Sequence, residues 1–143
     1  MKNRNKVAFI ANSSKRYRYY RMISDRSQGN TEVVFPLYPG LGLLLGAFKK
    51  PPLDEAVLLN DHLQRQAANY PKLTRYSWLW KIYCGVARIT ERARFGHYLA
   101  LFRRLNCDAV AIWNGQRQPY LTMVKAAEHA GKRVLYFENG LLP

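Results

Sequence analysis

Residues 108–137 contain the pattern that most restricts the fold of this chain, because two short apolar segments flank one amphipathic helix. Asp108–Trp113 and Arg133–Phe137 are both apolar and rich in residues that favour strands. Pro119–Ala130 between them is predicted to be helical, with Pro119 in the first turn and Gly131 as a C-cap. One face of this helix holds Tyr120, Met123, Val124 and Ala127. Strand, helix and strand in this order predict a parallel βαβ unit and an α/β fold.

The amino-terminal segment has the same character. Val7–Ala11 is a short apolar run without alternation, which is typical of a parallel strand covered on both faces. Asn12, Ser13 and Ser14 follow it and are turn and N-cap residues. A helix is expected over Lys15–Asp25, and a second strand over Glu32–Leu37.

The middle of the chain is predicted to be mainly helical. Pro39–Pro52 is irregular, with an apolar surface that either packing or membrane contact explains. Asp54–Tyr70 has apolar residues at helical spacing, and Pro71 is expected to end that helix. A longer helix is expected over Thr74–Leu105, with a possible break at Gly85 or Gly96. Its apolar face is predicted to contain Leu79, Tyr83, Val86, Phe95, Tyr98, Leu99 and Phe102.

The chain is strongly basic, with 23 Lys and Arg against 9 Asp and Glu in 143 residues and a formal charge of +14. Such an excess attracts anionic partners, among them nucleic acid, anionic lipid and acidic or phosphorylated sugars. The basic, tyrosine-rich Lys15–Asp25 can bind phosphates and stack bases, although a solvated helix face explains it equally well. No nucleic-acid-binding signature accompanies it, so nucleic acid is the less favoured partner. A second basic set comprises Arg88, Arg92, Arg94, Arg103 and Arg104.

Neither a targeting segment nor a cofactor motif is evident. The apolar runs are too short for a signal peptide or a membrane span, so we expect a cytoplasmic protein that is soluble or peripheral on the inner face of the membrane. Cys84 and Cys107 form no C-x-x-C pair, and the three histidines have no metal-ligand spacing. We therefore predict no metal and no cofactor.

Three segments leave the carboxyl ends of predicted strands, where ligands of open parallel sheets bind. These segments are Asn12–Ser14, Asn114–Gln118 and Glu138–Pro143. The second contains a glycine that permits close backbone approach and a guanidinium suited to carboxylate or phosphate. An ordinary βα turn explains it as well. The candidate substrate-binding residues are Asn12, Ser13, Ser14, Asn114, Gly115, Gln116, Arg117, Asn139 and Gly140.

Glu138 is the one carboxylate directly after a strand that is expected to be buried. At that position a glutamate can act as a general acid or base, or bind a sugar hydroxyl. Position alone favours a structural carboxylate bonded to an arginine or to backbone donors.

The carboxy-terminal residues resemble a known family. Ala111–Arg117 (AIWNGQR), the helix that begins at Pro119, and Val134–Pro143 (VLYFENGLLP) are similar to the capsule polysaccharide biosynthesis family, which contains transferases of 3-deoxy-D-manno-octulosonic acid (Kdo). The specific match covers residues 108–143, and the earlier chain agrees only in its order of elements.

The resemblance implies two facing Rossmann-like domains with the active site between them. Residues 1–143 would form the amino-terminal, acceptor-side domain, and a donor-binding domain would follow. The implied reaction transfers Kdo from CMP-Kdo to an anionic glycan or a lipid-linked acceptor. Glu138 would be catalytic, and the candidate substrate-binding residues would line the cleft. We expect the chain to be inactive without the second domain.

Two alternatives remain open. The chain can be a non-enzymatic basic module that binds nucleic acid or an anionic membrane. It can also be a fragment that folds poorly without its partner domain.

Overall fold

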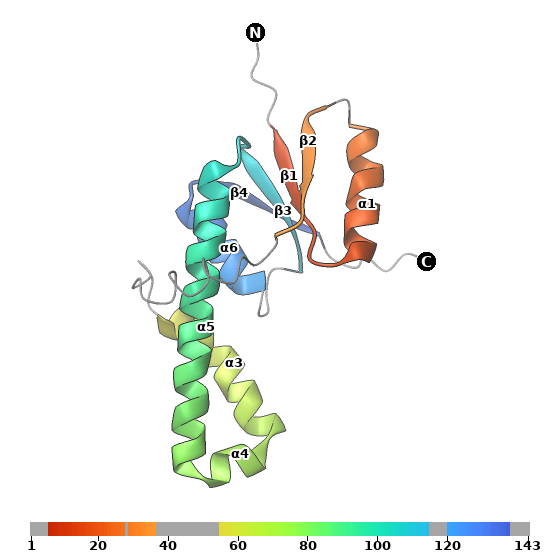
Figure 1. Ribbon diagram of the computed structural model, residues 1–143. Helices are drawn as coiled ribbons and strands as arrows, with labels where there is room; N and C mark the ends of the chain where they lie inside the picture. Colours follow the sequence, from red (N-terminus) through yellow and green to blue (C-terminus); the bar gives the residue numbers. More distant parts are fainter. Residues whose placement is uncertain (1–5, 28, 37–54, 115–119, 138–143) are drawn as a thin grey trace. The chain divides into compact units, whose positions relative to one another are not determined.

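The computed structural model describes residues 6–27, 29–36, 55–114 and 120–137 (Figure 1). The chain divides into two compact units. Met1–Tyr38 and Tyr98–Pro143 form the first, called the sheet unit, and Pro39–His97 forms the second, called the helical unit. The helical periodicity of residues 54–105 predicts the helices, but not that they gather into a separate unit. A donor-binding domain stays a prediction.

The sheet unit contains four parallel strands in the order β2-β1-β3-β4. The strands are β1 (Val7–Ile10), β2 (Thr31–Val34), β3 (Ala109–Trp113) and β4 (Arg133–Phe137). This arrangement confirms the predicted α/β, Rossmann-like fold and the parallel βαβ unit of the last third.

The two central strands are covered on both faces, as predicted for the first of them. Ala8 and Ile10 on one face of β1 are buried, and so is Phe9 on the other. Alternate residues of a strand point to opposite faces, so burial of all three requires a layer on each side. Phe9 packs against the fully buried Tyr20 of α1, with ring centroids 4.9 Å apart.

Strand β4 is different, and the expectation that it is buried was wrong. Leu135 and Tyr136 are 43% and 53% exposed. β4 lies at the edge of the sheet, where β3 is its only neighbour among the described strands. An apolar run therefore identified the strand correctly but not its position in the sheet.

Two helices connect the paired strands. α1 (Ser14–Asp25) begins after Ser13, whose side chain accepts a hydrogen bond from the Arg16 amide and so caps the helix. α6 (Tyr120–His129) links β3 to β4, and Gly131 follows it with a φ of 72°, a left-handed conformation suited to glycine. The two helices lie on opposite sides of the sheet (Figure 1).

The described part of the helical unit comprises α3 (Glu55–Asn69), α4 (Pro71–Arg75) and most of α5 (Ser77–Arg104). Pro71 begins α4, in the first-turn position that tolerates proline. α5 continues through Gly85 and Gly96 without the expected break, because glycine weakens a helix without removing its hydrogen bonds.

The predicted apolar face of α5 is only partly correct. Phe95, Tyr98 and Phe102 are buried, whereas Val86 is 57% exposed. Within the described ranges, no helix combines the length and apolar character needed to cross a bilayer. The predicted loop at Pro39–Pro52 lies outside the described residues.

Candidate functional site at the carboxyl edge of the sheet

The sheet reverses its direction of growth between β1 and β3. The chain passes from β1 to β2 on one side and, later, from β3 to β4 on the other. In open α/β sheets, this switch point at the carboxyl ends of the strands is where ligands bind. Asn12 follows β1 here, Trp113 ends β3, and Tyr120 begins α6.

A guanidinium joins these elements. Arg16 of α1 donates from Nη1 to Asn12 Oδ1 at 2.5 Å and also to the hydroxyl of Tyr120. The Tyr120 hydroxyl accepts a further hydrogen bond from Asn12 Nδ2. The Arg16 Cζ lies 5.1 Å from the centroid of the Trp113 ring and 5.5 Å from that of Tyr120. We call Asn12, Arg16, Trp113 and Tyr120 the Arg16 cluster.

The Arg16 cluster leaves hydrogen-bonding capacity unused. Nη1 supplies both of its protons to Asn12 and Tyr120, while the guanidinium has five N–H donors in all. Within the described ranges, Nε and Nη2 have no hydrogen-bond partner and Arg16 has no carboxylate partner. A positively charged edge with three donors therefore remains, and this edge suits a carboxylate or a phosphate.

Two further aromatic rings, those of Tyr19 and Tyr20, lie near Trp113. Tyr19 meets the Trp113 ring edge to face at 6.2 Å, and Tyr20 lies 6.3 Å from the same ring. Tyr19 is 45% exposed, so part of this aromatic surface faces solvent. A flat apolar surface beside a fixed cation can bind a ring that carries a negative charge.

Tyr20 packs against Phe9, Trp113 and Phe137. Its side chain is fully buried, and its hydroxyl has no hydrogen-bond partner among the described residues. Burial raises the pKa of Tyr20 to about 12, although the nearby Arg16 charge acts in the opposite direction. The phenol is therefore neutral at physiological pH.

At the amino edge of the sheet, in contrast, the cationic side chain is paired with a carboxylate. There Lys6 pairs with Glu32 at 2.7 Å, and its backbone amide donates to Asp108 Oδ2 at 2.9 Å. The hydrogen bond and charge of Glu32 raise the pKa of Lys6. Glu32 neutralises the local cation at this edge, whereas Arg16 at the carboxyl edge has no carboxylate partner among the residues that the structure describes.

The candidate substrate-binding residues that the structure describes have different roles. Asn12 belongs to the Arg16 cluster, Ser13 caps α1, and Ser14 is exposed in the first turn of that helix. Asn114 adopts a left-handed φ of 47°, and its amide donates to Phe137 O at 2.8 Å. This bond brings the ends of β3 and β4 together, as the βαβ pattern predicts. Outside the described residues lie Gly115, Gln116, Arg117, Glu138, Asn139 and Gly140.

Sequence reasoning missed three members of the cluster. Arg16 was assigned only to a general basic helix, Trp113 to a strand end, and Tyr120 to the apolar face of α6. A usable signal existed, because each residue lies within a few positions of the carboxyl end of β1 or β3. The periodic pattern of α6 obscured Tyr120, whose ring packs while its hydroxyl binds Arg16.

No group of three or more His, Cys, Asp or Glu side chains that could hold a metal ion occurs in residues 6–27, 29–36, 55–114 and 120–137. Comparisons with family models, with curated proteins and with solved structures found no match for this chain. The site must therefore be interpreted from its own geometry and from the sequence resemblance.

Proposed function

We propose that this chain is the acceptor-side domain of a cell-surface polysaccharide glycosyltransferase. In this proposal the Arg16 cluster binds an acidic sugar of the acceptor. The observation that carries the proposal is the guanidinium edge of Arg16, which has no partner among the described residues and lies at the switch point of the sheet.

The chemistry of the cluster supports an anionic ring as the ligand. Arg16 is held by Asn12 and Tyr120, so its orientation is fixed before a ligand arrives. Preorganisation reduces the entropy lost on binding. Nε and Nη2 form a planar fork that matches the two oxygens of a carboxylate. The guanidinium lies over the Trp113 ring, and the exposed Tyr19 ring beside Trp113 offers an apolar surface. A Kdo residue combines such a carboxylate with a sugar ring.

The reaction follows from the resemblance of residues 108–143 to the capsule polysaccharide family. The proposed donor is CMP-Kdo, bound by a second domain, and the acceptor is a glycan or a lipid-linked glycan. Glu138 is the proposed acid–base or nucleophilic carboxylate, and the remaining contribution of the protein is to position the two substrates. The loop residues Gly115–Arg117 and Asn139–Gly140 are proposed to contact substrate.

The proposal is tested by titrating the chain with a Kdo-terminated oligosaccharide and following binding by calorimetry. Arg16→Gln should weaken binding about tenfold to a hundredfold, because a hydrogen bond to a charged group contributes about 1.5–3 kcal/mol. Arg16→Lys should recover only part of this affinity, since an ammonium lacks the planar fork.

The matched control is Arg18→Gln, which removes an exposed arginine from the same helix. It should leave the affinity unchanged apart from a small long-range charge effect. A neutral oligosaccharide of the same length should bind much more weakly. Equal affinity for the neutral and acidic sugars, or equal losses in the two arginine variants, would refute the proposed role of the cluster.

A further inference from the structure

The helical unit exposes a line of apolar side chains along α5. Trp78, Ile82, Val86 and Ile89 are 54–61% exposed. Spacings of four, four and three residues place them on one face of the helix. At about 1.5 Å per residue, the line extends about 16 Å. Two tyrosines before it, Tyr70 and Tyr76, are 58% and 51% exposed.

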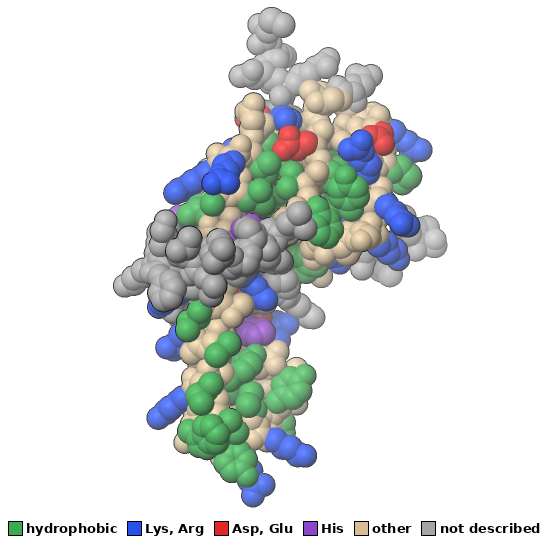
Figure 2. All heavy atoms as spheres, in the orientation of Figure 1, with side chains coloured by type: hydrophobic (Ala, Val, Ile, Leu, Met, Phe, Trp, Pro, Cys, Tyr) green, Lys and Arg blue, Asp and Glu red, His purple; other side chains and the backbone are tan. Residues whose placement is uncertain are grey.

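Cations border this apolar line. Lys81 and Arg88 are exposed and seven residues apart on α5, so they lie on one margin of the line. Lys72 and Arg75 of α4 are exposed at its amino-terminal end. Among the described residues, none of the four has a carboxylate partner. Figure 2 shows hydrophobic side chains gathered over the helical unit with Lys and Arg at the margins.

The same stretch of sequence lacks negative charge. Between Asp61 and Glu91 there is no Asp or Glu. Asp61 is paired with Arg65 at 2.8 Å, and Glu91 is buried and paired with Arg94 at 2.5 Å. The surface from Tyr70 to Ile89 is therefore both apolar and uniformly cationic.

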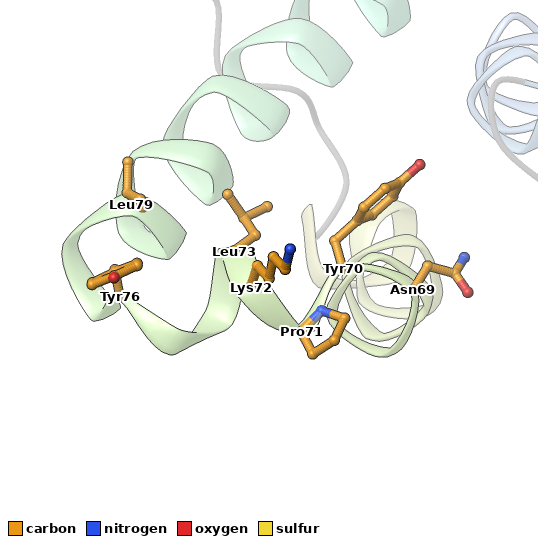
Figure 3. Close-up of a pocket in the computed structure, with 7 residues that line it drawn as sticks. All are labelled: Asn69, Tyr70, Pro71, Lys72, Leu73, Tyr76 and Leu79. Carbon is orange, nitrogen blue, oxygen red and sulfur yellow. The ribbon is translucent and has the colours of Figure 1, made fainter.

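An apolar pocket of about 540 Å³ lies at the turn between α3 and α5 (Figure 3). Its lining combines two partly exposed tyrosines, Tyr70 and Tyr76, with Leu73, Leu79 and the stem of Lys72. A pocket with apolar walls and a lysine among its lining residues can accept an acyl chain while the ammonium reaches a headgroup phosphate.

We infer that the face of α5 formed by Trp78, Ile82, Val86 and Ile89, with its bordering cations, binds the surface of an anionic phospholipid bilayer. Trp and Tyr prefer the membrane interface, where one part of the ring is apolar and the other hydrated. Ile and Val enter the acyl boundary, and Lys and Arg bind anionic headgroups. This inference does not depend on the proposed transferase activity.

The aliphatic residues favour a membrane over nucleic acid. Tyrosine and tryptophan can stack on bases, but Ile82, Val86 and Ile89 offer no aromatic face for stacking and no hydrogen bond. Exposing these apolar side chains to water costs free energy, and this cost is recovered when they enter an apolar phase such as the interior of a bilayer. The bordering cations, which have no carboxylate partner among the described residues, favour a phase that is negatively charged at its surface.

The test measures co-sedimentation of the full chain with phosphatidylcholine vesicles and with mixed phosphatidylcholine–phosphatidylglycerol vesicles. We expect binding to the mixed vesicles only. Lys81→Gln should weaken it about fivefold, the effect of about one Lys or Arg near an anionic surface. Trp78→Ser should weaken it by at least about tenfold, because a large apolar area no longer leaves water.

Two substitutions on α1 serve as matched controls. Met22→Ser removes an exposed apolar side chain, and Arg18→Gln removes an exposed cation. Neither should change vesicle binding by more than about twofold, since small residual charge effects act over a Debye length. Circular dichroism of every variant establishes that the fold is retained.

Three results would overturn the inference. One is absence of binding to the mixed vesicles, and another is an equal loss of binding in the α1 controls. The third is tight binding of single-stranded RNA that depends on Lys81 while vesicles do not bind, which would make the face a nucleic-acid surface. None of these results depends on a sugar, so failure here is distinguishable from failure of the proposed function.

Discussion

The sheet unit and the helical unit are both basic, but they place their apolar side chains differently. In the sheet unit, Ile10, Val110 and Ile112 are at most 2% exposed, and Arg16, which has no carboxylate partner in the described part of the chain, lies beside the rings of Trp113 and Tyr120. In the helical unit, Trp78 and Ile82 are more than half exposed beside cations. Charge therefore does not distinguish the two units. The side chains beside the charged groups distinguish them, and they favour a small anionic ligand for the sheet unit and an anionic surface for the helical unit.

Of the substitutions that probe this difference between the units, Ile112→Ala in β3 should have the largest effect. The side chain is fully buried, so its truncation leaves a cavity. We expect the free energy of unfolding to fall by about 2–5 kcal/mol. Urea denaturation followed by circular dichroism measures this change. A loss below about 1 kcal/mol would show that the centre of the sheet is not tightly packed.

Tyr20→Phe should have an intermediate effect that depends on pH. At neutral pH, removing a buried hydroxyl that has no partner among the described residues should leave stability unchanged or raise it by about 1 kcal/mol. In the wild-type chain the folded-state pKa is raised from 10.0 to about 12. The neutral phenol is thus favoured by folding, and this stability is fully present below pH 10 and lost as the pH rises towards 12.

Alkaline denaturation of the two proteins checks this expectation. Over that pH range the wild-type chain should lose about 2–3 kcal/mol that the Phe variant retains. Tyr83, whose pKa is also raised by burial, lies in the helical unit and is present in both proteins. Identical alkaline profiles would mean that the Tyr20 hydroxyl is solvated.

The smallest effect is expected for Ile82→Ala, which makes the same chemical change as Ile112→Ala on the exposed face of α5. Because the side chain is 57% exposed, the free energy of unfolding should change by no more than about 0.5 kcal/mol. Alanine is also the better helix former. Urea denaturation gives the value, and a loss as large as that of Ile112→Ala would show that this face is packed inside the protein and is not free to bind a bilayer.

Local sequence patterns predicted much of the sheet unit. The predictions identified two strands and the N-cap of α1 correctly, at Val7–Ala11, Arg133–Phe137 and Ser13. They succeeded because strand formation and helix capping depend mainly on residues close in the sequence. The exposure of Val86 could not be predicted, since a helical pattern shows which residues share a face and not which face meets another element.

The order of strands and helices, the parallel α/β fold and the positive charge could be predicted from the sequence, because propensity, periodicity and composition are local or additive properties. The contact of Arg16, Trp113 and Tyr120 could not be predicted in this way, because these residues are separated by up to 104 positions and are brought together by the pairing of β1 with β3. The same holds for the edge position of β4 and for the exposed apolar face of α5. Burial depends on which surfaces find a partner, and that is a property of the folded chain.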